Sequence, residues 1–227
     1  MSKPFVLVAV GLDFEARLAL GHGDVKVCCG RHTQMAVALA TAVGPGCSGI
    51  VSFGIAGGLD PELRTGHHIV ASSVIGTNGV RTALPTDERW AQHLLRTRPQ
   101  AVHAPILGVD RPVTHPEDKV RLFRQTGAAA VDMESHIAAS VAMRHGLPFA
   151  VLRVVADPAE QRVPHAALHG MRPDGSLDAI GVLQALCRRP ADIAGMPRVA
   201  HNTYRARAAL GRALTGLGRG FGLLDLG

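Results

Sequence analysis

The chain has 227 residues, of which 47% are hydrophobic and 19% charged, the composition of a globular protein of one domain. Its apolar runs, such as 5–10 and 36–43, are far shorter than the ~20 residues that a membrane-spanning helix needs. The net charge of +6 raises the question of nucleic acid, but the chain has only one Trp, one Tyr and six Phe, and no basic run interleaves them. We therefore expect a protein that binds no nucleic acid.

The four cysteines predict neither a disulfide framework nor a zinc site, because none of them forms a C-x-x-C pair. His165 and His169 lie four residues apart but lack the Glu of the zinc-binding H-E-x-x-H motif, so we expect no metal ion. The first apolar run is followed by Asp13 and Glu15 and has no Ala-x-Ala cleavage site. It is typical of a buried strand rather than a signal peptide, and the expected location is the cytoplasm.

The regular elements are predicted from short apolar runs and from helical periodicity. The Val-rich run 5–10 is typical of a strand buried on both faces, and similar runs predict strands at 25–29, 49–53, 69–75, 101–109 and 149–155. Helical periodicity predicts helices at 35–43, 88–96, 117–123, 134–145, 178–188 and 203–214. Because strands and helices alternate, we expect an α/β sandwich. The Gly-rich end, 216–227, is predicted to be frayed.

Three carboxylates follow predicted strands, where an open α/β sheet places its ligand crevice. Glu15 follows the first strand, Glu134 opens a helix, and Asp157 follows the last strand. Glu134 and Asp157 each have a plainer interpretation: a carboxylate is favourable in any first helical turn, and Asp-Pro is a common turn. The Gly-rich segment 54–58 could let the backbone approach a ligand or could be only a tight turn.

Four segments in combination carry a resemblance to a known family. They are Gly11-x-x-x-Glu15, Gly54-x-Ala56-Gly57-Gly58-Leu59, Val131-Asp132-Met133-Glu134 and Arg153-x-x-x-Asp157. This pattern, over about residues 4–157, resembles the purine nucleoside phosphorylase/nucleosidase superfamily and, within it, methylthioadenosine/S-adenosylhomocysteine nucleosidase. The resemblance implies a three-layer α/β/α sandwich with a mixed central sheet. We expect a single domain over 1–227, with a catalytic core at about 4–157 and a helical extension at about 158–227, in a homo-oligomer.

The resemblance also implies roles for individual residues, and it implies no cofactor. Asp157 would protonate or hydrogen-bond N7 of the purine, Glu134 with Met133 would hold the ribose hydroxyls, and Glu15 would orient and deprotonate the attacking water. Ile55, Ala56 and Gly57 would line the substrate site. An acid and a base on opposite sides suit the oxocarbenium character that develops on the sugar, provided that Asp157 keeps its proton while the other two carboxylates are ionised.

Three positions depart from the family pattern. Ile55 stands where members usually have Ser or Thr, and Ser52 stands where phosphorylases have a phosphate-binding Arg. Water is therefore favoured over phosphate as the acceptor, although Arg17, Arg31 or Arg64 could still supply a phosphate site. Arg111 stands where the nucleosidase has an aromatic that stacks on adenine, and a guanidinium plane can also stack on a base. We expect Arg111 to contact the base.

The C-terminal segments 163–165, 174–177 and 201–205 resemble a branch of the superfamily associated with hopanoid biosynthesis. This implies a lipid-linked nucleoside, adenosylhopane, as the substrate. Residues 188–227 hold seven Arg and two Asp, so we expect salt-sensitive peripheral membrane contact. The residues expected to touch lipid are Leu210, Leu214, Leu217, Phe221 and Leu223, and the alternative is that they pack against the sheet or a partner subunit. A non-catalytic nucleoside-binding module is the competing class of function.

Overall fold

The computed structural model describes residues 2–30, 32–76, 83–168 and 178–226. Its strands are β1 (Phe5–Val10), β2 (Val25–Cys29), β3 (Cys47–Gly58), β4 (His68–Gly76), β5 (Ala83–Pro85), β6 (Val102–Gly108), β7 (Ala130–Asp132) and β8 (Phe149–Asp157). Its helices are α1 (Asp13–Leu20), α2 (His32–Ala42), α3 (Glu88–Thr97), α4 (Pro116–Thr126), α5 (Ser135–Arg144), α6 (His165–Leu168), α7 (Ala179–Arg188) and α8 (Met196–Ala213). Short 3₁₀ turns follow at Pro190–Gly195 and Leu223–Asp225. His169 and the segment 174–177 lie outside the described residues.

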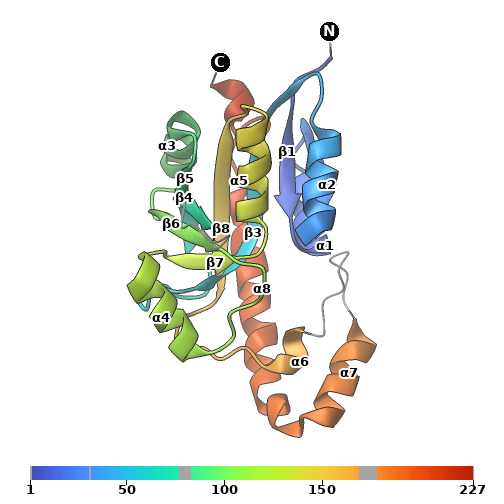
Figure 1. The fold of residues 1–227 in the computed structure, drawn as a ribbon, viewed down its shortest axis with the longest axis vertical. Helices are drawn as coiled ribbons and strands as arrows, with labels where there is room; N and C mark the ends of the chain where they lie inside the picture. The colour runs from blue at the N-terminus through green and yellow to red at the C-terminus, as the bar shows by residue number, and fades with distance from the viewer. Residues whose placement is uncertain (1, 31, 77–82, 169–177, 227) are drawn as a thin grey trace.

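The central sheet is mixed, as predicted. Strands β2, β1, β3 and β8 lie side by side in this order and are parallel to one another. On its other edge β8 pairs antiparallel with β4, and the end of β3 pairs antiparallel with β7. Strands β4, β6 and β7 are again parallel, so β3, β8, β4, β6 and β7 pair in a closed ring. This ring brings the ends of β3, β7 and β8 together, although the strands are far apart in the chain (Figure 1).

Helices cover both faces of the sheet and make the expected three layers. On one face, Leu7 and Ala9 of β1 pack in the same core as Met35 of α2 and Val141 of α5. On the other face, alternate strand residues such as Val8 pack with α1, α3 and α8. Because both faces are covered, all six residues of β1 are buried, which is why that strand has a continuous apolar sequence rather than an alternating one.

The structure corrects several predicted boundaries near the site. Strand β3 continues to Gly58, and 54–57 pair with β8, so the Gly-rich segment is strand and not a tight turn. Helix α1 and the strands β5 and β7 were not predicted. Helix α1 begins after Leu12, which is not an N-capping residue type, and β5 and β7 have only three residues each. Elements this short carry no readable periodicity.

The C-terminal end is packed rather than frayed. Leu210, Leu217 and Phe221 are fully buried in the core that α3 and α8 share with the sheet, and Leu214 and Leu223 are partly buried there. The indole Nε1 of Trp90 donates a hydrogen bond to the carbonyl of Phe221 at 2.8 Å. The prediction of fraying is therefore wrong for 216–226, and the expected lipid contact of these five residues is wrong because they pack against the sheet.

Helix α8 begins at Met196, seven residues before the predicted start at Thr203. The breaker Pro197 lies in the first turn of the helix, where its missing N–H is not needed. Helices α6 and α7 and the first part of α8 project beyond the sheet (Figure 1). Over the described residues, no helix is both long enough and apolar enough to cross a membrane.

Candidate active site

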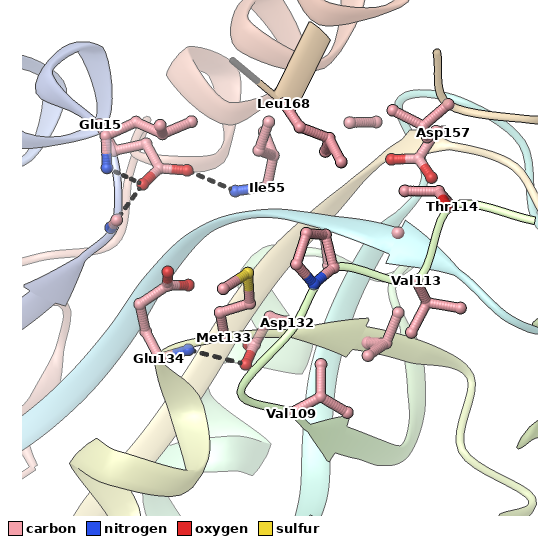
Figure 2. Close-up of a pocket in the computed structure, with 18 residues that line it drawn as sticks. Glu15, Ile55, Val109, Val113, Thr114, Asp132, Met133, Glu134, Asp157 and Leu168 are labelled. Atoms are coloured by element: carbon pink, nitrogen blue, oxygen red, sulfur yellow. Dashed lines mark hydrogen bonds between the residues drawn. The ribbon is translucent and has the colours of Figure 1, made fainter. Parts of the chain in front are cut away.

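One cavity lies at the carboxyl ends of β1, β3, β7 and β8. It brings together seven of the predicted site residues, namely Glu15, Ile55, Ala56, Gly57, Met133, Glu134 and Asp157. Figure 2 shows Glu15 and Glu134 at one end of the cavity, Asp157 at the opposite end and Met133 between them. Most of the remaining lining is apolar, from Leu12, Val109, Pro112, Val113, Val163 and Leu168. The carboxylates thus form two separate polar ends of an otherwise apolar cavity.

Glu15 is held in place by backbone N–H groups. Its Oε2 accepts hydrogen bonds from Gly11 N at 2.9 Å and Leu12 N at 3.0 Å, and its Oε1 accepts one from Ile55 N at 2.7 Å (Figure 2). Burial raises the pKa of Glu15 to about 7, with Arg153 acting against the rise and Glu134 adding to it. A carboxylate with a pKa near neutrality is suited to take a proton from water.

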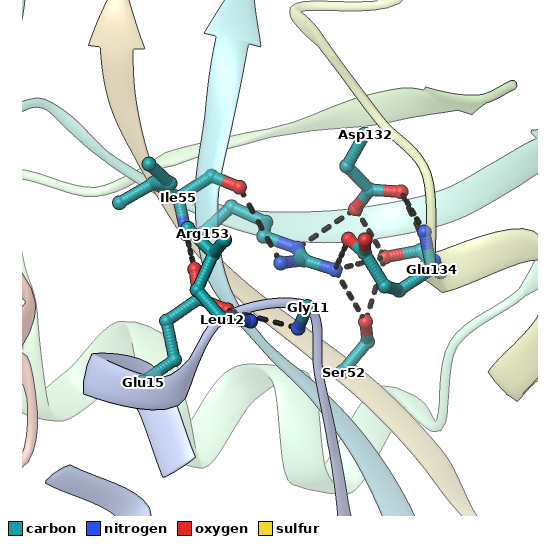
Figure 3. Close-up of polar contacts among 9 residues, drawn as sticks. Gly11, Leu12, Glu15, Ser52, Ile55, Asp132, Glu134 and Arg153 are labelled. Carbon is teal, nitrogen blue, oxygen red and sulfur yellow. Dashed lines mark hydrogen bonds and ion pairs between the residues drawn. The ribbon is translucent and has the colours of Figure 1, made fainter. Parts of the chain in front are cut away.

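Arg153, on β8, was quoted as part of the family pattern but given no role by the sequence. It is fully buried between the carboxylates, with Nε 2.7 Å from Asp132 Oδ2 and Nη2 3.3 Å from Glu134 Oε2 (Figure 3). Burial acts to lower the pKa of Arg153, but three neighbouring carboxylates hold it above its ordinary value. The guanidinium therefore balances the negative charge of this end of the cavity.

Asp132 links this charge cluster to the start of α5. Its Oδ1 accepts hydrogen bonds from Glu134 N at 3.3 Å and Ser135 N at 3.0 Å, so the carboxylate caps two free N–H groups of the helix. Its Oδ2 accepts a hydrogen bond from the hydroxyl of Ser135, and Ser135 Oγ also lies within hydrogen-bond distance of Ser52 Oγ, at 2.9 Å. The motif Val-Asp-Met-Glu is therefore partly structural: Asp132 fixes the helix start from which Glu134 reaches the cavity.

Two glycines make room for the carboxylates. A Cβ at Gly11 would lie 2.5 Å from Glu134 Oε1, and a Cβ at Gly54 would clash with Glu15 Oε1 and lie 2.5 Å from Arg153 Nη1. Gly54 also has a φ of +154°, a conformation that other residues rarely adopt. The glycines that the sequence pattern quotes thus have a steric reason, which is close approach to acidic side chains.

Asp157 ends β8 and is partnered by a lysine that the sequence analysis did not single out. Lys119 Nζ, from α4, lies 2.6 Å from Asp157 Oδ2. Burial raises the pKa of the Asp157 carboxyl, and the Lys119 ammonium acts against this rise. The raised pKa agrees in direction with the requirement that Asp157 keep a proton.

The structure does not bring Arg111 into the cavity. Its side chain is exposed, while Pro112, Val113 and Thr114 of the same segment line the cavity. Arg17 and Arg64 do not line it either: Arg17 is exposed beside Asp13, and Arg64 donates to the carbonyl of Leu63 at 3.1 Å. Arg31 lies outside the described residues. Over the described part of the chain, no group of His, Cys, Asp and Glu could hold a metal ion.

A sequence model of the phosphorylase superfamily matches residues 14–188. The chain therefore belongs to the phosphorylase superfamily, as the sequence pattern predicted. It is an enzyme of the nucleosidase and nucleoside phosphorylase kind. Comparison with curated protein sequences gives no significant match.

Solved structures of nucleosidases share the fold. The 5′-methylthioadenosine/S-adenosylhomocysteine nucleosidase of Helicobacter pylori superposes with a TM-score of 0.70 at 14% identity, over 99% of each chain. The S-adenosylhomocysteine nucleosidase of Streptococcus pyogenes gives 0.67 at 16% identity, over 96% of this chain and 99% of the other. The futalosine hydrolase of H. pylori strain 26695 gives 0.60 at 16% identity, over 69% and 89%. At such low identities the likeness shows the fold alone.

Proposed function

We propose that the protein hydrolyses the N-glycosidic bond of a 5′-substituted purine ribonucleoside and releases adenine. The observation that carries this proposal is the separation of acidic groups in one cavity, with Glu15 and Glu134 at one end and Asp157 at the other (Figure 2). A nucleoside that spans the cavity would place its ribose at the first end and its base at the second. The superfamily match supports the same reaction type.

In the proposed reaction, water attacks C1′ of the ribose and gives a proton to Glu15. The C1′–N9 bond breaks, its electron pair passes into the purine, and N7 takes a proton from Asp157. Glu134 accepts hydrogen bonds from the ribose hydroxyls and, with Arg153 behind it, faces the positive charge that develops on the sugar. General acid–base catalysis of this kind typically contributes ~10²–10⁴-fold.

The charge of the cavity favours water over phosphate as the acceptor. Among the described residues that line the cavity there is no Lys or Arg. Arg153 lies nearby but is already paired with Asp132 and Glu134. A phosphate dianion would meet carboxylates without a cation of its own, which is unfavourable in a site of low dielectric constant. Phosphorolysis of the same bond is the alternative.

For the 5′ substituent, we propose a large apolar group of the adenosylhopane type. The resemblance of the C-terminal segments to the hopanoid-associated branch motivates this substrate. The apolar side chains of Val109, Val163 and Leu168 in the cavity wall support an apolar substituent over a charged one. The two nucleosidases of H. pylori and S. pyogenes act on adenosines with sulfur-linked 5′ groups, as their names state. Peripheral contact with a membrane would then give access to the substrate.

An assay of base release tests the function. We expect adenine and a free sugar from a 5′-substituted adenosine at equal rates with and without phosphate, and the highest kcat/KM for the most apolar 5′ group in a series with methylthioadenosine and S-adenosylhomocysteine. A strict requirement for phosphate, with ribose 1-phosphate as product, would overturn the choice of water. If no substrate releases adenine although calorimetry detects nucleoside binding, the protein is a binding module instead.

Substitution of the proposed acid tests the site. Asp157→Asn keeps the shape of the side chain but has no carboxyl proton, so we expect kcat to fall ~10²–10⁴-fold with little change in the thermal midpoint. Asp118→Asn is a matched control, since Asp118 lies on the surface of α4 beside Arg121. An Asp157→Asn enzyme as active as this control would contradict the assignment.

A further inference from the structure

Lys119 is a buried cation for which the reaction described above has no use. It lies in α4, and its side chain has 0% exposure. An ammonium group is costly to bury unless it is paired and hydrogen-bonded, so its partners indicate what it is for. All of its hydrogen-bond partners come from the segment 157–161, which follows β8 and begins with the proposed acid.

The contacts use the full donor capacity of the lysine. Nζ lies 2.6 Å from Asp157 Oδ2, 2.9 Å from the carbonyl of Pro158 and 3.0 Å from the carbonyl of Gln161. An ammonium group has three N–H donors, which these three contacts account for, and the carbonyl of Asp157 is a longer fourth contact at 3.4 Å from Nζ. They are made by the charged form, so Lys119 is arranged to hold its partners rather than to pass a proton on.

The position of Asp157 is restricted on a second side. Its carboxylate lies over Gly57 of β3, where a Cβ would come 3.2 Å from Oδ2 and 3.7 Å from Oδ1. Because Lys119 donates a hydrogen bond to Oδ2, Oδ1 is the carboxyl oxygen that would contact the base. The neighbouring strand β3 presents Gly57 to this carboxyl, and α4 presents Lys119, which is the charged group that acts on it.

We propose that Lys119 is a positioning residue for purine departure: it holds Asp157 by Oδ2 so that Oδ1 meets the base, and it supplies the positive charge against which Asp157 ionises. This rests on the proposed function, because it assumes that Asp157 acts on the base. The competing explanation is purely structural, since Lys119 also ties α4 to the segment after β8. The two explanations differ in what happens to substrates whose leaving group needs no proton.

The experiment compares two leaving groups. Lys119→Met keeps most of the length of the unbranched side chain and removes its charge. With methylthioadenosine we expect kcat to fall about 10²-fold and KM to change little, because the acid is misplaced. With 4-nitrophenyl ribofuranoside, whose phenolate leaves without a proton, we expect a loss of less than about tenfold. Asp157→Asn should show the same contrast, whereas Glu15→Gln should lose activity on both substrates. Equal losses of Lys119→Met on both would overturn the proposal.

The pH profile gives an independent readout. Without the ammonium, the pKa of Asp157 should rise, because burial then acts unopposed. The alkaline limb of kcat/KM, where Asp157 loses its proton, should therefore move up by about one pH unit or more in Lys119→Met. Lys119→Arg keeps the charge and should keep the limb in place while lowering kcat. An unmoved limb in a folded Lys119→Met enzyme would contradict the proposal, as would a moved limb in Lys119→Arg.

A double variant guards against the case in which wild-type enzyme does not accept the nitrophenyl substrate. If Lys119 acts through Asp157, then Lys119→Met in the Asp157→Asn background should cost no further activity, whereas independent effects would multiply. Thermal unfolding checks that each variant is folded. If Lys119→Met does not fold, the position of the alkaline limb in Lys119→Arg tests the proposal instead. Failure of the wild-type protein to release any purine would instead refute the proposed function, so the two failures are distinguishable.

Discussion

The position of the Glu134 carboxylate depends on the absence of a side chain at Gly11. Gly11 begins the segment between β1 and α1, and the Glu134 carboxylate occupies the space that a side chain would take at that position. The same relation holds between Gly54 and Glu15. Backbone N–H groups and Gly54 thus fix Glu15, and Arg153 and Gly11 fix Glu134. These contacts restrict the two carboxylates to the orientations that the proposed reaction needs.

A methyl group at Gly11 should therefore displace Glu134 without unfolding the protein. In Gly11→Ala the new Cβ would meet Glu134 Oε1 at 2.5 Å, and the carboxylate is the end of a flexible side chain that can move away. We expect kcat/KM to fall ~10²-fold, the typical cost of misplacing a reacting group by about 1 Å. Gly44→Ala is the control, because a Cβ there meets nothing within 4 Å. Equal activity of the two variants would show that the position of Glu134 is not critical.

The raised pKa of Glu15 predicts that pH has opposite effects on activity and on stability. Its pKa is raised from 4.5 to about 7, so the ionised form that accepts a proton is lost as the pH falls through about 7. Rates of base release should fall tenfold per pH unit below that value. The folded state binds this proton more tightly than the unfolded state, so the contribution of Glu15 to stability is present below about pH 4.5 and lost as the pH rises through about 7.

The matched measurement for Glu15 is the Glu15→Gln variant, followed by kcat/KM and by thermal midpoint from pH 4.5 to 8. The variant has no carboxyl at this position and should lack both the acidic limb near pH 7 and the opposing change in stability. A wild-type acidic limb that lies below pH 5 would show that Glu15 is not the group whose ionisation controls the rate.

At the residue level, the sequence pattern found the carboxylates but not the cations. Glu15, Glu134 and Asp157 follow strands in a family pattern, and all three line one cavity. Arg153 was visible in that pattern, but its partners come from β7 and the start of α5, which no local signal connects to it. Lys119 lies in a polar helical segment, PEDKVRLFRQT, in which a lysine is typical of an exposed face. Its burial depends on tertiary packing alone.

The prediction of helices and strands has the same limit, since a sequence pattern does not report contacts between distant segments. The long apolar strands and the amphipathic helix α3 were predicted because burial on one or both faces leaves a readable pattern. Strand β7 has three residues and exists because the end of β3 and β6 hydrogen-bond to it. The C-terminal residues 216–226 read as frayed because glycine is frequent there, but Leu217 and Phe221 bury their side chains against the sheet. Tertiary packing therefore orders this segment, and glycine content alone does not reveal that packing.

Removal of a C-terminal aromatic should thus destabilise the whole domain. Phe221 is fully buried and lies edge to face with Phe53 of β3, with ring centroids 5.1 Å apart. Phe221→Ala should lower the free energy of unfolding by about 3–5 kcal/mol, as for other buried Phe side chains. Tyr204→Ala is the control: this side chain is 73% exposed on α8, so its loss should cost less than about 0.5 kcal/mol. Similar costs in chemical denaturation would mean that the tail is not part of the core.

On the scale of the molecule, the ring of strands explains how a site is made from distant parts of the chain. Glu15 follows β1, Glu134 follows β7 and Asp157 ends β8, and the pairing of β3 with β1, β7 and β8 brings these three ends together. Variation in the helices beyond β8 can then change what the cavity accepts without moving the carboxylates. Val163 and Leu168, which line the cavity, belong to that C-terminal part.

The charge of the C-terminal part leads to a prediction about the proposed membrane contact. The apolar residues first expected to touch lipid are buried, but Leu183, Ile193 and Tyr204 are exposed on α7, the 3₁₀ turn and α8. Exposed arginines accompany them at Arg188, Arg189 and Arg205. Each basic residue near an anionic surface contributes about 1 kcal/mol, so three of them and exposed apolar groups suffice for reversible, salt-sensitive binding.

Flotation with vesicles that contain an anionic lipid measures this binding. Wild-type protein should float at low salt and be released at high salt, since surface charges are screened beyond about 10 Å at 0.1 M salt. The triple variant Arg188→Glu, Arg189→Glu and Arg205→Glu should stay at the bottom of the gradient. The control variant Arg96→Glu, Arg124→Glu and Arg144→Glu changes the net charge equally at exposed positions of α3, α4 and α5, and it should float like wild type. Equal loss in both variants would mean that net charge alone attracts the protein, and absence of flotation in the wild type would refute the contact.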